Sequence, residues 1–576
     1  MSIHSPQRGP LPLVIGITGH RDLLLDDIPT IRKAIASFFT DLMKDYPSTP
    51  LCLLSSLAEG ADSLAAEVAL EMNIKLMVAL PFPQSVYEMD FETEASRQNF
   101  RKLLSAATQI NEVPLAQGVT ATSVAVYGAD RNLQYLEAGR FVLLHSQILL
   151  ALWDGVFNMK TGGTGEVVKL QLEGKTYSSL LAEDQHQLST GAVCHVMTRR
   201  ASSLVENMAI QPVRNSLLQC GELEWLYPSS LETGGTLDEE QHRLWGCIDA
   251  FNQDCIQLPE KNMEASKAGL IADEELSLAC LHFLQQFGWA DGLAQHYQRK
   301  TINAFRQIAL YVPISVFCFE VFSNAWTGLP VIAGYLIALV AAYTVFKWAE
   351  RRHYHRKYLD YRALAEGLRV QFFWKMAGMN EPVEKYYLIR QESELDWIRH
   401  ALRTFDFVGG NHSTVHPSSK LSVIKQSWID AQTKYYERVL LRDYKKLIGL
   451  QKKIKLLVQV GMWVFTPAML VIHGFNWGGQ LLYQCIQVAV SSIFVVAGAL
   501  SYYTEKMQYE SHITQYRRMS ALFKRYASLW EFLMADDENK QPPCQSLLFE
   551  LGKASLVENS DWVLTHRRQP LEVPRG

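Results

Sequence analysis

Two pairs of long apolar segments stand out in the hydrophobic pattern of the chain, at about residues 305–348 and 454–503. The segments of each pair approach the roughly 20 residues that an α-helix needs to cross a hydrocarbon layer about 30 Å thick. Turns without Lys or Arg join them, at 323–328 and 473–479, and a long helical pattern rich in basic and aromatic residues follows each pair. The pattern predicts four transmembrane helices in two hairpins.

A different pattern covers about residues 11–200, where short aliphatic runs alternate with segments of helical periodicity. Such alternation is typical of βαβ units around a parallel sheet. The first helical segment has Asp26 or Asp27 as its N-cap and Pro29 in its first turn. We therefore expect a Rossmann-like α/β domain with a parallel sheet, followed by an all-α membrane region. The predicted strands are 13–18, 51–55, 75–80, 147–153 and 192–198.

The basic residues near the hairpins predict their orientation. Arg299, Lys300 and Arg306 precede the first apolar segment, and Lys452 and Lys453 precede the third. Because Lys and Arg at span ends tend to stay on the cytoplasmic side, we expect both termini to be cytoplasmic and only the two short turns to lie outside. The leader at 2–10 lacks the apolar core of a cleavable signal, so the first span should direct insertion.

Composition narrows the classes of function. A net charge of −4 with 20% charged residues argues against a binder of nucleic-acid polymers. The nine cysteines lack the Cys or His spacing of a zinc site, so we expect reduced thiols and no metal centre. Residues 203–291 show no catalytic pattern, and the two histidines within 409–419 lack a third ligand, which indicates a solvated loop.

Candidate chemistry lies just after the predicted strands. In an open parallel sheet, ligands bind beyond the carboxyl ends of the strands. Glycine turns and helix N-termini there offer backbone N–H groups to phosphates. Each glycine could simply be required by a sharp turn, but several such turns at one sheet edge favour an anionic, nucleotide-like ligand. The candidate ligand-binding residues are Thr18, Gly19, His20, Arg21, Glu59, Gly60, Ala61, Asp62, Asp154, Gly155, Gly162, Gly163, Thr164, Glu166 and Arg199.

An ordered set of motifs in the first 200 residues resembles the SLOG superfamily: GITGHRD, LAEGADSLAAEVAL, LPFPQSVYEMDF, and ALWDG followed by GGTGEVV. The resemblance implies a domain that senses a nucleotide-derived ligand, such as a cyclic oligonucleotide or an ADP-ribose derivative, without another cofactor. LOG phosphoribohydrolases of this group carry PGGxGTxxE, whereas here the Pro is missing and Glu166 follows Gly163 by only three residues. That spacing would misplace the carboxylate for cleavage at the ribose, which favours sensing over catalysis. Asp62 and Glu166 would then either accept hydrogen bonds from ribose hydroxyls or cap their helices.

The membrane half of the chain repeats itself. Placing Glu350 over Glu505 also aligns Tyr354 with Tyr509, and at the same offset Tyr361 with Tyr516, Arg362 with Arg517 and Arg369 with Lys524. Each copy would contain a lead-in helix, a two-span hairpin and a long emerging helix. This pattern is similar to the SLATT family of two-span modules. The aromatic stripe on the emerging helix is either packing surface between helices or a lever from sensor to spans.

The predicted organisation has six parts. They are a SLOG-like nucleotide-sensing domain at 1–200, a helical connector at 201–294, a first SLATT-like unit at 295–374, a cytosolic helical linker at 375–434, a second SLATT-like unit at 435–530 and a tail at 531–576. Within the linker, residues 392–404 are amphipathic and should pack on the cytosolic helices.

Glu320 is an ionisable residue inside the apolar segments, where a charge is costly unless it faces water, a partner or a pore. It also stands close enough to Ser323 to extend to the membrane interface. Gln459 and Gln487 could line a polar seam or join neighbouring helices. We consider Glu320, Gln459 and Gln487 as pore or gating candidates.

Together these features lead to a functional hypothesis. The chain would be a non-enzymatic, ligand-gated membrane effector that forms a pore or disrupts the membrane, located as a multi-pass protein in the bacterial inner (plasma) membrane. A role in antiviral defence rests on the resemblance alone. Its partners would be the lipid bilayer, a nucleotide second messenger and further copies of the chain, because four spans enclose little space. The alternatives are a membrane-anchored nucleotide hydrolase of LOG type and a scaffold whose sheet edge binds nothing.

Overall fold

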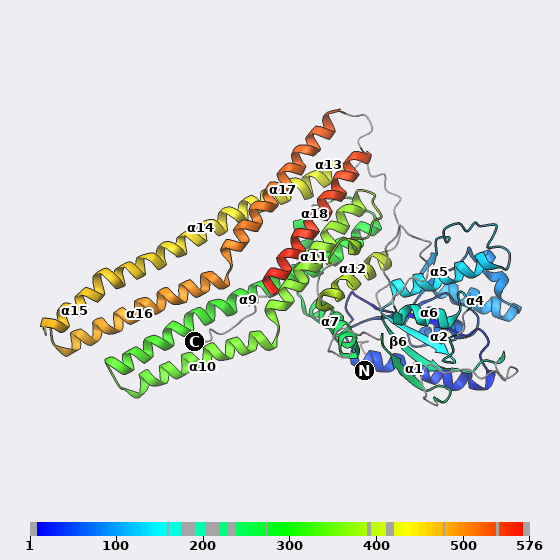
Figure 1. Ribbon diagram of the computed structural model, residues 1–576, viewed down its shortest axis with the longest axis horizontal. Helices are drawn as coiled ribbons and strands as arrows, with labels where there is room; N and C mark the ends of the chain where they lie inside the picture. The colour runs from blue at the N-terminus through cyan, green and yellow to red at the C-terminus, as the bar shows by residue number, and fades with distance from the viewer. Residues whose placement is uncertain are drawn as a thin grey trace. The chain divides into compact units, whose positions relative to one another are not determined.

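The computed structural model describes residues 8–157, 160–173, 191–202, 218–228, 237–271, 274–388, 393–409, 420–475, 478–536 and 541–567. The predicted loop at 409–419 lies almost entirely outside these residues. The chain divides into two compact units, Met1–Gln257 with Glu392–Gly410, and Leu258–Gln391 with Asn411–Gly576. The first unit is an α/β domain and the second is all-α, as predicted (Figure 1).

The α/β unit is built on a seven-stranded sheet with the order β4-β3-β2-β1-β5-β6-β7. Strands β1 to β6 are parallel, and Ile15 of β1 pairs with both Leu53 of β2 and Ile148 of β5. Only the last strand of this described sheet, β7, runs antiparallel, along β6. The bounds are β1 (Leu13–Gly19), β2 (Leu51–Ser55), β3 (Lys75–Leu80), β4 (Gln109–Glu112), β5 (Ile148–Trp153), β6 (Ala192–Met197) and β7 (Leu223–Leu226).

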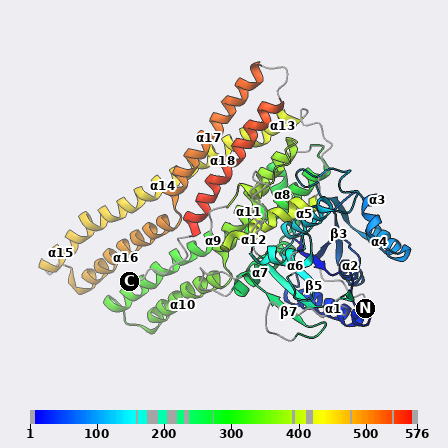
Figure 2. The same ribbon diagram turned by 45° about the vertical axis from the view of Figure 1, so that its right-hand side comes forward.

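Helices cover both faces of the sheet (Figure 2). On one face α1 packs against α2, and on the other α5 packs against α6, where Val167 lies close to Gly139. Buried aliphatic residues of the central strands fill the space between sheet and helices, because both faces of a parallel sheet are covered. The bounds are α1 (Ile28–Asp45), α2 (Ala61–Glu71), α3 (Gln84–Tyr87), α4 (Glu94–Ala106), α5 (Ala129–His145) and α6 (Thr164–Glu173).

Two helices from later in the chain complete the first unit. The side chain of Asn252 in α7 (Leu237–Gln257) exchanges two hydrogen bonds with the backbone of Leu11, at 2.8 and 2.9 Å. Helix α12 (Asp396–Gly409) packs against α5 and α7, and its Phe407 joins the buried cluster around Val14 and Val142. The amphipathic segment that we expected on the cytosolic helices therefore packs partly on the α/β domain itself.

Within the described residues, the second unit contains four helices that are long and apolar enough to cross a membrane by length and composition. Large apolar side chains on them are exposed, including Ile337 at 70% and Trp463 at 74%, as expected for lipid contact. The bounds are α8 (Glu260–Leu270), α9 (Leu278–Asn324), α10 (Leu329–Arg351), α11 (Tyr354–Met376), α13 (Leu421–Ile424), α14 (Ala431–Val460), α15 (Thr466–Phe475), α16 (Gly479–Lys506), α17 (Tyr509–Asp536) and α18 (Gln541–Arg567).

The predicted duplication has a counterpart in the backbone. His353 lies between α10 and α11 with a φ of 51°, and Gln508 lies between α16 and α17 with a φ of 48°. These two left-handed residues are related by the same offset that aligns Glu350 with Glu505. In both copies the left-handed N–H group bonds to that Glu carbonyl, at 2.9 and 3.0 Å. The same break thus separates the hairpin from the emerging helix in each copy. The second copy differs by a π-helical segment, Gly461–Phe465, and another such segment, Lys425–Asp430, precedes it.

Candidate functional site

The loops at the carboxyl ends of β1, β2 and β5 converge at the point where the strand order reverses. Strands β2, β3 and β4 follow on one side of β1, whereas β5, β6 and β7 lie on its other side. Such a switch point is where open α/β sheets bind ligands. The Ala61 N–H at the start of α2 donates to the His20 carbonyl at 3.0 Å, which ties the loop after β2 to the loop after β1.

Two glycines permit this close approach of loops. Gly60 has a φ of +83°, and a Cβ there would lie 2.3 Å from the Arg21 carbonyl oxygen. At Gly19 a Cβ would lie 2.3 Å from the Ala61 Cβ. No other residue therefore fits at either position unless the backbone moves. These glycines are required by loop packing, whether or not a ligand binds.

His20 and Asp154 form a pair across β1 and β5. The His20 Nε2 atom lies 3.2 Å from Asp154 Oδ1 and accepts the Asp154 backbone N–H at 3.0 Å. Although burial opposes ionisation, the contacts of the carboxylate with His20 and with the Val156 N–H lower the pKa of Asp154. The Asp154 carboxylate also accepts the Val156 N–H at 3.1 Å, which shapes the turn at Gly155. The pair thus holds the two central loops together.

Asp62 is a buried acid in the first turn of α2. It is 5% exposed and accepts a hydrogen bond from the Ser55 hydroxyl at 3.2 Å. Burial raises the pKa of Asp62 to about 7, against the opposing effects of Ser55, Arg21 and the nearby backbone N–H groups. An acid with such a pKa can hold or release a proton near neutral pH. Its contacts are with its own loop, so it does not act as a simple helix cap.

An aromatic and ionic cluster beside Arg21 was not predicted. Arg21 is exposed, and its guanidinium carbon lies 5.1 Å from the ring centroid of Tyr135 in α5. The Tyr135 hydroxyl donates to Asp90 and accepts from Arg131 at 3.1 Å. Arg131 and Asp90 form an ion pair at 2.6 Å with both side chains 2% exposed. The buried pair therefore positions Tyr135, whose ring supports Arg21.

The turn before α6 belongs to the same edge. Gly162 has a φ of +76°, and a Cβ there would lie 3.0 Å from the Tyr135 Cβ. Its N–H donates to Glu166 at 2.8 Å, so the Glu166 carboxylate closes its own turn. The Gly163 N–H bonds to the Lys160 carbonyl at 3.0 Å, and Thr164 begins the helix. The carboxylate that a LOG hydrolase would use is thus already engaged by the backbone.

Arg199 is also engaged within the protein. It donates to both carboxylate oxygens of Asp27, at 2.8 and 2.6 Å, at the start of α1. The hydrogen bonds of Arg199 lower the pKa of Asp27. Asp27 occupies the N-cap position that we predicted, but its side chain makes no capping hydrogen bond. The remaining predicted residues, Thr18 near the end of β1 and Glu59 in the loop before α2, are half-buried.

The exposed Arg21, its aromatic support and the N-termini of α2 and α6 all favour negative charge. Among the described residues, no group of three or more His, Cys, Asp or Glu side chains could hold a metal ion. The raised pKa of Asp62 suits proton transfer near neutral pH.

A second predicted set lies on the membrane helices. Asn324 donates to Glu320 at 2.9 Å and accepts from Gln487 at 2.9 Å, which joins α9 of the first hairpin to α16 of the second. Asn324 was not predicted, although it supplies the link. Gln459 lies elsewhere, in a groove of about 970 Å³ lined by α14, α16 and α17. The three pore candidates therefore do not form one cluster.

Comparison with models of known protein families and with curated proteins finds no match for this chain.

Proposed function

We propose that the chain is a ligand-gated membrane protein in which an anionic, nucleotide-derived signal binds at the switch point of the α/β unit. The exposed Arg21 over Tyr135, beside two glycine-shaped loops and two helix N-termini, is the observation that carries the proposal. The four candidate membrane helices are the output, forming a pore or disrupting the bilayer. Gating requires that the signal bind the open form more tightly than the closed form.

The finer features of this proposal follow from the sequence resemblance. A SLOG-like sensor joined to two SLATT-like hairpins suits a bacterial defence effector in the inner membrane with both termini in the cytoplasm. The charge pattern around the hairpins supports that orientation. Four spans enclose little space, so an open pore needs several copies of the chain.

Liposome flux tests this function. The purified chain is reconstituted with a trapped dye, and cyclic di-AMP, a cyclic trinucleotide and ADP-ribose are added in separate trials. We expect at least one nucleotide to release dye, and Arg21→Ala to weaken the response at least tenfold. Arg140→Ala is the matched control, because Arg140 pairs within α5 with Glu137. Dye retention with all three nucleotides would reject the pore.

The hydrolase alternative rests on the pKa of Asp62, which suits a general acid or base. Incubation of the same nucleotides with the purified chain, followed by chromatography, distinguishes it from the sensor. A sensor leaves the nucleotides intact. Turnover that is lost in Asp62→Ala or Glu166→Ala would establish the hydrolase instead.

A further inference from the structure

A large polar cavity lies in the second unit, outside the apolar segments of the hairpins. Its volume is about 730 Å³, which falls within the ~300–1,000 Å³ typical of small-molecule sites. Helices α9 and α11 of the first copy and α14 and α17 of the second copy form its wall, together with α8 and α18. A molecule bound here would therefore touch both copies of the duplicated unit.

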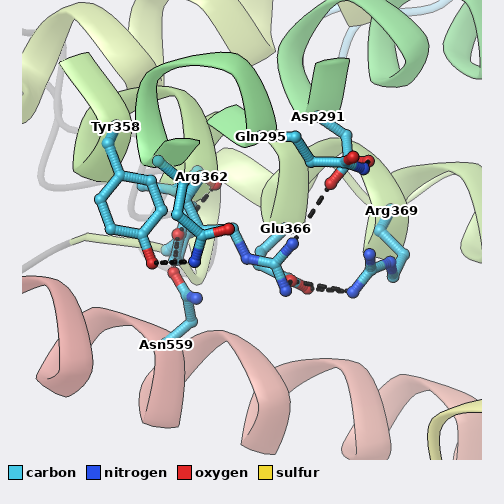
Figure 3. Close-up of polar contacts among 10 residues, drawn as sticks. Asp291, Gln295, Tyr358, Arg362, Glu366, Arg369 and Asn559 are labelled. Atoms are coloured by element: carbon cyan, nitrogen blue, oxygen red, sulfur yellow. Dashed lines mark hydrogen bonds and ion pairs between the residues drawn. The ribbon is translucent and has the colours of Figure 1, made fainter. Parts of the chain in front are cut away.

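A chain of ion pairs crosses one wall of this cavity (Figure 3). The Arg362 guanidinium lies 3.2 Å from Asp291 Oδ1 and 2.5 Å from Glu366 Oε1. Arg369 donates to both oxygens of Glu366 at 2.8 Å, and Gln295 donates to the second oxygen of Asp291 at 2.7 Å. Two arginines thus neutralise the acids of the wall.

The other charged side chains of the wall are basic. Arg299, Lys434 and Arg438 line the cavity and are exposed. The wall therefore has five basic side chains against two acidic ones, a clear positive excess. A concave surface with this excess attracts and retains an anion.

Two buried polar atoms in the wall lack a hydrogen-bond partner within the described part of the chain, Arg369 Nε and Gln515 Oε1. Arg369 is 9% exposed, and its guanidinium lies 5.3 Å from the ring centroid of Phe287. Buried polar groups in native proteins are almost always paired. Both atoms are almost completely inaccessible, so the other side chains of the wall form the surface that the cavity offers to a ligand.

Aromatic side chains supply the remaining surface. The Tyr436 and Tyr516 ring centroids lie 6.1 Å apart, and Tyr358 meets Trp562 edge-on at 6.0 Å. Tyr435 also lines the cavity and is 38% exposed. The exposed ring of Tyr435 suits a flat aromatic base, because it offers a face for stacking.

We propose that this cavity binds a nucleotide with one base and one phosphate, at a site separate from the sheet edge. The phosphate lies against Arg438, Lys434 and Arg299, and the base stacks on Tyr435. Binding ties α11 of the first copy to α14 of the second and so regulates how the copies move. The proposal does not depend on the function assigned to the α/β unit.

Calorimetric titration of the full chain in detergent tests this site. The probes are AMP, GMP, CMP and UMP at up to millimolar concentration, with adenosine and ribose 5-phosphate as fragments. We expect one monophosphate or more to bind, and the fragments to bind at least tenfold more weakly. Adenosine lacks the phosphate that contacts the basic side chains, and ribose 5-phosphate lacks the base that stacks on Tyr435.

Variants on α14 provide matched controls. Arg438→Gln and Tyr435→Ala should each weaken monophosphate binding at least tenfold. Lys445→Gln and Tyr444→Ala change residues of the same helix that are also exposed but do not line the cavity, and should leave affinity unchanged. Arg21→Ala should also leave it unchanged, which separates this site from the sheet edge.

Four results would overturn the proposal. They are no binding by any of the four monophosphates, equal binding by the fragments, binding that is insensitive to both cavity variants, and binding that is lost in Arg21→Ala. None of these results would bear on dye release by the cyclic nucleotides or ADP-ribose, so the two proposals fail independently.

Discussion

Asp62 shows how a single side chain links the sheet edge to the stability of the protein. Burial raises its pKa from 3.8 to about 7. Between these values the folded chain keeps a proton on Asp62 that the unfolded chain releases. The contribution of Asp62 to the free energy of unfolding is therefore fully present below about pH 4 and is lost as the pH rises toward 7. For this rise in pKa the contribution is up to about 4 kcal/mol.

Asp62→Asn should remove this pH dependence, because the amide stays neutral. We expect the Tm of the variant, relative to the parent chain, to rise from pH 5 to pH 8 when both are followed by thermal unfolding in detergent. Asp41→Asn, at an exposed position of α1, is the control and should show a constant difference. A constant difference in Asp62→Asn as well would show that Asp62 is ionised throughout.

Much of the candidate site could be predicted from local sequence, because glycines and strand ends are local signals. Gly19, Gly60 and Gly162 do meet at one edge. The cluster of Asp90, Arg131 and Tyr135 could not be predicted, since these residues meet only through tertiary packing. The four-residue spacing of Arg131 and Tyr135 on one helix face was the available signal. Arg199 was predicted as a ligand contact, but its partner Asp27 was interpreted as an N-cap.

At the scale of helices and strands, buried elements were predicted better than edges. Strands β2 and β3 have the predicted bounds, since central parallel strands are continuous apolar runs. Strands β4 and β7 were missed, because each is a four-residue edge strand with exposed positions and little apolar signal. The packing of α12 was predicted only in part, because amphipathicity shows that a helix packs but not on what.

The link between α9 and α16 leads to a prediction for the hairpins. Gln487→Leu removes the donor to Asn324, so we expect lower thermal stability and several-fold higher dye release from liposomes without nucleotide. Buried polar contacts between membrane helices contribute roughly 0.6–2 kcal/mol. Gln459→Leu makes the same change away from this link and should alter neither quantity. Equal effects of the two substitutions would mean that the link does not hold the hairpins.

For the whole molecule, the course of the chain suggests how a signal passes to both hairpins. The chain leaves the α/β unit after Gln257, returns at Glu392 and leaves again after Gly410. The returning segment contains α12, which packs on the α/β unit through Phe407 and through Thr404, which accepts a hydrogen bond from Gln147 at 3.0 Å. Each copy of the duplicated unit is thus covalently joined to an element of the α/β unit.

Loosening α12 should uncouple ligand binding from output. Phe407→Ala removes a side chain that is 7% exposed and leaves the switch-point loops unchanged. We expect the variant to bind the nucleotide that the parent chain binds most tightly with an affinity within about threefold of the parent, a change below ~1 kcal/mol. Dye release should fall at least tenfold. Arg399→Gln is the control, since Arg399 pairs within α12 with Asp396. If binding and dye release fall in parallel, α12 stabilises the α/β unit without transmitting the signal.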